Sequence, residues 1–121
     1  MKVLLIEPNK VPRSHNIADA LETMQHIVDG PIQAIYPFDE PVALICNEEA
    51  KLTSLPPNRA LRDETGTIYD IICGTFFLCS APPDSENFES LTKDQMERYT
   101  QRFQRPEVFL RVNGEIVAVP V

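Results

Sequence analysis

Prolines, glycines and polar turns recur along this chain and separate short strand-like segments. The secondary-structure elements are therefore expected to be short. Val3–Ile6 is a continuous apolar run, and the predicted strands that follow it are Ile32–Tyr36, Val42–Asn47, Ile68–Ile72 and Thr75–Cys79. Apolar runs of four to eight residues between turn signals are typical of buried strands. We therefore expect a domain built largely from short strands.

The segment VFLRVNGEIVAVPV at the end of the sequence carries the clearest local signal. Asn113-Gly114 separates two runs in which apolar residues alternate. This pattern is typical of a two-residue turn in which both residues have positive φ. The sequence predicts a β-hairpin over Val108 to Val119.

Two segments have helical periodicity. The first runs from Ser14 or Asn16 to Asp29 and is followed by Gly30-Pro31, which is a typical helix stop. Its apolar residues at helical spacing are Ile17, Leu21, Met24 and Val28. The region between the strands at 42–47 and 68–72, written LTSLPPNRALRDETGT, is expected to be a loop.

The second helix has a marked beginning and end. Thr92 and Gln95 have the spacing of a capping box, and Pro106 ends the helix. Arg102 and Arg105 near its carboxyl end would stabilise the helix through its dipole.

A chain of 121 residues lies within the usual range of one domain. The predicted fold class is α+β: a single compact domain over 1–121, with about seven mostly antiparallel strands, two helices and a C-terminal β-hairpin.

The charge balance excludes some classes of partner. Eighteen acidic and eleven basic residues give a net charge of −7, which disfavours direct binding to nucleic acid or to an anionic membrane. No apolar run approaches the roughly 20 residues that span a bilayer. The opening MKVLLIEPNK does not have the pattern of a signal peptide. We expect a cytoplasmic protein.

The three cysteines, Cys46, Cys73 and Cys79, lie in apolar strand-like runs. They are expected to be unpaired and mostly buried thiols, as in a reducing compartment. Their spacing does not suggest a metal site, and none of the common phosphate-binding or hydrolase motifs is present. We predict no catalytic residue, metal or cofactor, and enzymatic activity stays open.

One group of polar residues stands out between positions 47 and 75. The candidate ligand-binding residues are Asn47, Lys51, Asn58, Arg59, Arg62 and Thr75, with Gly74 beside them. Arginine forks suit carboxylate or phosphate oxygens, and asparagine both donates and accepts. If this is a site, at least two of Lys51, Asn58, Arg59 and Arg62 should present their polar ends to one concavity. The alternative is that Arg59 and Arg62 pair with nearby acidic residues.

The segments MKVLLIEPNK, YPFDEPVALICNEEAKL, LPPNRALRDETGTIYDIICGTFF and RVNGEIVAVPV resemble a family of small proteins of phages and conjugative elements, domain of unknown function 3846. The most specific part is the ordered series Asn47-Glu48-Glu49, Leu55-Pro56 with Asn58, and Gly74-Thr75-Phe76. The resemblance extends over nearly the whole chain. It implies a mobile-element origin, supports the 47–75 segment as a site and implies no reaction.

Three hypotheses follow. The first is a non-catalytic module that binds a nucleotide-like or other anionic small molecule, with a counter-defence role as its setting. The second is an acidic protein that contacts a host protein or mimics DNA. The third is an enzyme that these motifs do not reveal. Whether the chain forms a homo-oligomer is left open.

Overall fold

The computed structural model describes residues 1–121 and contains nine strands and two helices. In chain order they are β1 (Lys2–Ile6), β2 (Arg13–Asn16), α1 (Leu21–Val28), β3 (Ile32–Ile35), β4 (Val42–Asn47), β5 (Pro57–Arg62), β6 (Ile68–Cys73), β7 (Phe76–Ser80), α2 (Lys93–Arg102), β8 (Glu107–Val112) and β9 (Glu115–Pro120). The predicted α+β class is confirmed.

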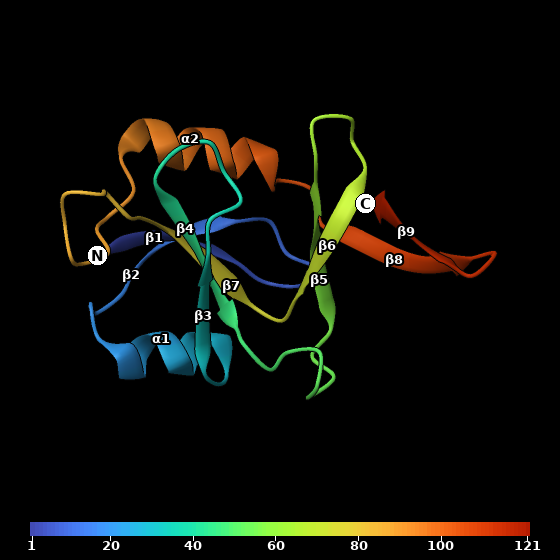
Figure 1. The fold of residues 1–121 in the computed structure, drawn as a ribbon, viewed down its shortest axis with the longest axis horizontal. Helices are drawn as coiled ribbons and strands as arrows, with labels where there is room; N and C mark the ends of the chain where they lie inside the picture. The colour runs from blue at the N-terminus through green and yellow to red at the C-terminus, as the bar shows by residue number, and fades with distance from the viewer.

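Five strands form the central sheet, in the order β2-β1-β7-β4-β3 (Figure 1). Every pair in it is antiparallel. The hairpins β5–β6 and β8–β9 are separate two-stranded sheets, also antiparallel. Both lie toward the same end of the molecule (Figure 1).

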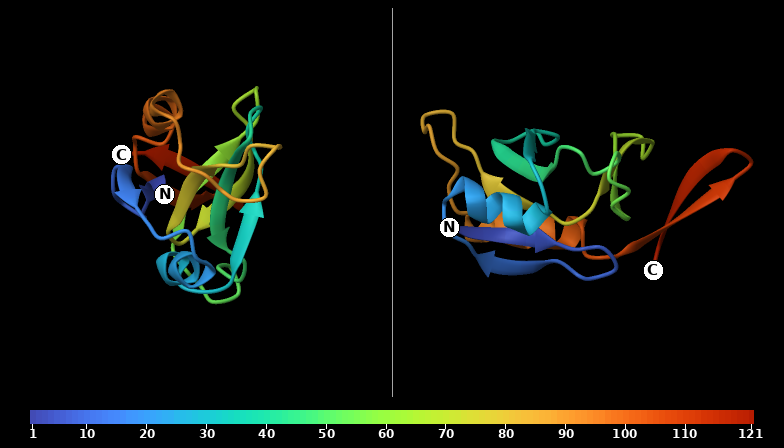
Figure 2. Two further views of the ribbon diagram at one scale, coloured as in Figure 1. Left: turned by 90° about the vertical axis from the view of Figure 1, so that its left-hand side faces the viewer. Right: turned by 90° about the horizontal axis from the view of Figure 1, so that it is seen from below.

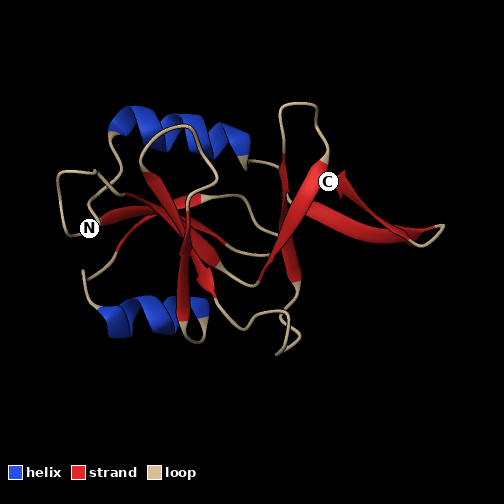
Figure 3. Cartoon of the chain, in the orientation of Figure 1, coloured by secondary structure: helices blue, strands red, loops and turns tan.

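The two helices cover opposite faces of the central sheet (Figure 3). Leu4 and Ile6 pack on the side of α2, whereas Val3 and Leu5 pack on the side of α1. Successive side chains of a strand point to opposite faces, so a strand buried on both sides needs apolar residues at every position. The two-sided burial explains why the sequence contains continuous apolar runs.

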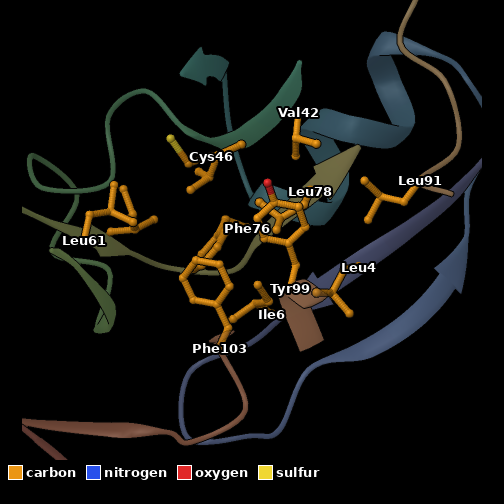
Figure 4. Close-up of a cluster of buried hydrophobic side chains, with 12 residues drawn as sticks. Leu4, Ile6, Val42, Cys46, Leu61, Phe76, Leu78, Leu91, Tyr99 and Phe103 are labelled. Atoms are coloured by element: carbon orange, nitrogen blue, oxygen red, sulfur yellow. The ribbon is translucent and has the colours of Figure 1, made fainter. Parts of the chain in front are cut away.

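The core on the α2 side is rich in aromatic rings (Figure 4). Phe76 of β7 and Phe103 after α2 meet edge to face, with ring centroids 5.8 Å apart. Leu61 of β5 and Ile72 of β6 join the same cluster. The β5–β6 hairpin is therefore anchored to the sheet through its apolar side chains.

The first helix begins later than its periodicity predicted. Residues 13–16 form β2, and α1 covers only Leu21–Val28. The backbones of Met1 and Ile17 exchange hydrogen bonds of 2.8 and 2.9 Å, which extends the pairing of β2 with β1. Ile17 is buried, as the helical pattern requires, but it reaches the core from an extended segment. Pairing with β1 outweighs the local helical preference.

The predicted loop in the middle of the chain contains a strand. Residues 57–62 form β5, paired with β6 through a register interrupted by two irregularities, between Pro57 and Arg59 and between Leu61 and Arg62. Polar residues and the neighbouring prolines obscure the strand pattern in the sequence. This strand and β2 raise the number of strands above the predicted seven.

Local signals at the ends of elements predict the structure well. Thr92 caps α2, and its side chain and that of Gln95 form the complete capping box. At the tip of the β8–β9 hairpin, Asn113 has φ of 51° and Gly114 has φ of 82°. The predicted hairpin with two positive φ angles is confirmed.

The β8–β9 hairpin projects from the rest of the molecule (Figure 2). Register pairs Val108 with Val119 and Leu110 with Val117, so these four side chains share one face with Val112. Each of the five is between 39% and 49% exposed. We call them the aliphatic face.

A helix that crosses a membrane needs more length and more apolar character than either helix of this chain has.

Loss of the capping box should destabilise the domain measurably. Thr92→Ala removes the side-chain acceptor of the Gln95 backbone N–H, which lies 3.1 Å from Thr92 Oγ1. We expect the free energy of unfolding to fall by about 1 kcal/mol in urea denaturation. Lys93→Ala is the control, because this neighbouring side chain is exposed and makes no hydrogen bond or ion pair. Equal stability of the two variants would contradict the role of the cap.

Candidate functional site

The structure divides the predicted ligand-binding residues among separate places. Asn47 and Lys51 line one cavity of about 170 Å³. Arg59 and Arg62 line another, of about 290 Å³. Thr75 lines a third, of about 130 Å³. Of Lys51, Asn58, Arg59 and Arg62, only Arg59 and Arg62 line the same cavity.

Asn47 and Asn58 are buried and hold the backbone together. Asn47 Nδ2 donates to the carbonyl oxygens of Val28 and Asp29 at the end of α1, at 3.0 and 2.9 Å. Asn58 Nδ2 donates to the carbonyl oxygens of Ile6 and Gly74, both at 2.9 Å. Their amide groups are engaged within the chain rather than offered to a ligand.

Arg59 is the most fully engaged residue of the predicted set. It is only 2% exposed. Its guanidinium donates to the carbonyl oxygens of Phe103, Lys10 and Asn58, and to Asn58 Oδ1, through five hydrogen bonds of 2.6 to 3.3 Å. A guanidinium has five N–H donors, so none remains for a ligand. Burial lowers the pKa of Arg59, and the nearby Glu107 carboxylate opposes this effect.

Lys51 and Gly74 also have internal explanations. Lys51 Nζ lies 2.9 Å from Asp70 Oδ1, and this hydrogen bond raises the pKa of the amine. Gly74 has φ of +78°, and a Cβ there would lie 2.8 Å from Leu55 Cδ1. The neighbour that leaves no room for a side chain at Gly74 is therefore Leu55 rather than a ligand.

The three cysteines are free thiols. Cys46 and Cys79 are buried, whereas Cys73 is half-buried. Burial is the main cause that raises the pKa of Cys46 to about 11 and that of Cys79 to about 12. These two thiols stay protonated near neutral pH and are poor nucleophiles.

The cavity that Arg59 and Arg62 share is the best candidate site in the molecule. We call it the arginine groove, and the residues that define it are Arg59, Arg62, Gln101, Arg102, Arg105 and Glu107. It lies where the carboxyl end of α2 meets β5 and the root of β8. Four of the seven arginines of the chain line this one cavity. Only one acidic residue, Glu107, faces them there, so the groove is locally cationic in a chain of net charge −7.

Arg62 forms an ion pair with Glu107, which is buried. Arg62 Nη2 lies 2.6 Å from Glu107 Oε1, and the other carboxylate oxygen accepts from the Ala60 N–H at 2.6 Å. The Arg62 side chain is still 35% exposed. Only one of its nitrogens contacts the carboxylate, and Arg62 lines the groove.

Arg102 and Arg105 are the free cations of the groove. Both are exposed, and neither forms an ion pair with a carboxylate. The Arg102 guanidinium lies over the rings of Phe38 and Phe103, 4.9 and 5.8 Å from their centroids. Stacking on rings orients a guanidinium and leaves its N–H donors in the plane free for another acceptor.

The comparisons with known proteins place the chain in a family. The family model described as Domain of unknown function (DUF3846) matches residues 1–104. The chain belongs to this family. No curated protein and no solved structure matches it.

The matched part of the DUF3846 chain ends just after α2. It includes Arg59, Arg62, Gln101 and Arg102 but not Arg105 or the β8–β9 hairpin. The segment RVNGEIVAVPV, part of the resemblance seen in the sequence, lies outside the match. The family resemblance is confirmed over 104 of the 121 residues.

Sequence reasoning assigned Arg102 and Arg105 to helix stabilisation and missed their place in the groove. A partial signal was present, because the two arginines are only three residues apart in the sequence. In the structure α2 ends at Arg102, and Arg105 lies in the connection to β8. Nothing in the sequence indicated that β5 would bring Arg62 beside them. No group of three metal-ligating side chains gathers anywhere in the chain.

Arg59 should be essential for stability. Arg59→Ala leaves the buried carbonyl oxygens of Phe103 and Lys10 without their donor, so we expect the free energy of unfolding to fall by about 3 kcal/mol. Thermal or urea denaturation measures the loss, and the exposed Arg111→Ala on the hairpin is the control. A melting temperature close to that of the wild type would refute the structural role of Arg59.

Proposed function

We propose that this DUF3846 protein is a non-catalytic binding module for an anionic small molecule, held in the arginine groove. The observation that carries the proposal is that Arg102 and Arg105 face the same cavity as Arg62 and have no carboxylate partner. We assign Arg62, Arg102 and Arg105 as the residues that contact the ligand. Arg59 also lines the groove but is buried, and its N–H groups are bonded within the chain.

The chemistry of the groove supports an oxyanion as ligand. A guanidinium presents parallel N–H donors that match two oxygens of a carboxylate or phosphate. The Gln101 side chain adds an amide that both donates and accepts. A volume of about 290 Å³ is near the lower limit of small-molecule sites and suits a metabolite rather than a protein segment.

The lining of the groove supports binding rather than catalysis. No serine, threonine, cysteine, histidine or lysine side chain lines it. Its one carboxylate, Glu107, is engaged by Arg62 and by the Ala60 N–H. The groove thus lacks a nucleophile and a free general base, which hydrolysis or group transfer would need.

The cellular setting of the proposal rests on the family and on the thiols. The resemblance to proteins of phages and conjugative elements suggests a mobile-element origin, and an anionic signal molecule of host defence would fit the groove. Three free cysteines, two of them buried and one half-buried, fit a reducing compartment. We propose that the protein acts in the cytoplasm.

Titration calorimetry with pyrophosphate at low ionic strength tests the proposed function. We expect binding to the wild type, and a loss of about tenfold or more in affinity for Arg102→Ala and for Arg105→Ala, because each removes a charge-assisted hydrogen bond. Arg111→Ala, outside the groove, should bind like the wild type. No binding by the wild type, or an equal loss in all three variants, would overturn the proposal.

A second candidate function is protein contact, and the aliphatic face of the β8–β9 hairpin favours it. We propose a second copy of this chain as the occupant. Two copies of net charge −7 repel each other over most of their surface. The one charged residue on this face is Glu115, opposite Val112 next to the turn. The stretch formed by Val108, Leu110, Val117 and Val119 is uncharged, so two copies can meet there without opposing like charges.

Sedimentation equilibrium over a range of concentrations tests this contact. The wild type should self-associate weakly, and Leu110→Lys should prevent it. Ile116→Lys is a matched control, because Leu110 and Ile116 are both 49% exposed but lie on opposite faces of the hairpin. A wild type that stays monomeric, or an equal effect of both variants, would exclude the second copy as the partner.

A further inference from the structure

A second cavity adjoins the arginine groove and shares Arg62 and Arg102 with it. We call it the Tyr69 cavity. It has a volume of about 530 Å³. The lining residues that it does not share with the groove include Phe38, Asp39, Glu64 and Tyr69. The two shared arginines form the boundary between the cavities. A ligand bound to these arginines on one side is therefore within reach of the other cavity.

Beyond the two shared arginines, the lining of the Tyr69 cavity is acidic and aromatic, unlike that of the groove. Its wall carries the ring of Tyr69, which projects from β6 and is 56% exposed. Asp39 and Glu64 lie on its rim, are exposed and have no partner within the chain. Asp63, also on the rim, already accepts hydrogen bonds from Thr65 and from the Thr67 N–H. The cavity thus offers an aromatic surface and two free carboxylates.

Such a pair of cavities sorts the two ends of a ligand by charge. Carboxylates accept hydrogen bonds and repel an anionic group, so the oxyanion is directed to the arginine groove, where Arg105 adds to the shared Arg102, and away from the carboxylates of the Tyr69 cavity. A group that enters the Tyr69 cavity should be flat, to stack on the ring, and should carry N–H donors for Asp39 or Glu64. A nucleobase with an exocyclic amino group has both properties.

We infer that the ligand of this protein is a nucleotide, with its phosphates in the arginine groove and its base against Tyr69. The inference rests on the proposed function, because it assigns the same groove to the phosphates. The ribose would lie over Arg62 and Arg102, whose side chains separate the two cavities. Arg102 is already held by stacking on Phe38 and Phe103, so it is oriented before the ligand arrives.

Comparison of ADP with pyrophosphate separates this inference from the proposed function. We expect ADP to bind the wild type more tightly than pyrophosphate. Tyr69→Ala should weaken ADP binding by about tenfold, because one base loses its stacking partner, and should leave pyrophosphate binding unchanged. Tyr36→Ala is the matched control: Tyr36 is 59% exposed, close to the 56% of Tyr69, and lies in neither cavity.

The pair CDP and UDP tests the role of the carboxylates. Cytosine has an amino group where uracil has a carbonyl oxygen, so CDP should bind more tightly than UDP. The double variant with Asp39→Asn and Glu64→Gln should reduce that preference. Both residues are exposed, so the variant should fold like the wild type, which its melting temperature checks.

The remaining outcomes distinguish a failure of the nucleotide inference from a failure of the anion site. If pyrophosphate and ADP bind equally and Tyr69→Ala changes neither affinity, the nucleotide inference is wrong and the anion site stands. Equal binding of CDP and UDP to the wild type would likewise exclude base recognition by the carboxylates. If neither pyrophosphate nor ADP binds, the inference and the proposed function are both wrong.

Discussion

The arrangement of this molecule depends on the buried pair Asn58–Arg59. Asn58 fastens β5 to the end of β1 and to the turn before β7 by donating to the carbonyl oxygens of Ile6 and Gly74. Arg59 then donates to Asn58 Oδ1, to Lys10 and to Phe103 at the end of α2. Taking a guanidinium out of water is costly unless all its donors are satisfied, so the charge specifies one relative placement of these segments.

That placement creates the candidate site. Because Arg59 holds Phe103, the carboxyl end of α2 lies beside β5, and the exposed Arg102 and Arg105 reach the same space as Arg62. Glu107, bound to Arg62 and to the Ala60 N–H, attaches the root of the projecting hairpin at the same point. Arg59, which the sequence suggested as a ligand contact, is thus the buried support of the residues that we propose as ligand contacts. This separation of a buried supporting arginine from exposed arginines fits the proposed binding module, because the support need not move when a ligand binds.

The central sheet provides the frame for this arrangement. Its middle strands are buried on both faces, with α1 on one side and α2 and the β5–β6 hairpin on the other. Leu61 and Ile72 insert the hairpin into the aromatic cluster around Phe76. The hairpin thereby brings Arg62 and Tyr69 to the end of the molecule where α2 ends, so two cavities of different chemistry adjoin.

The sequence by itself determined the features that depend on nearby residues. Continuous apolar runs predicted the buried strands, Thr92 and Gln95 predicted the start of α2, and Asn113-Gly114 predicted the hairpin turn, because each signal acts within a few residues. Tertiary structure decided that residues 13–16 pair with β1 rather than join a helix, and that β5 forms within a polar, proline-bounded segment. It also determined which charged residues are buried and bonded within the chain and which are exposed. An arginine has the same sequence signature whether it is buried like Arg59 or free like Arg102, and only contacts made by residues far apart in the chain distinguish the two.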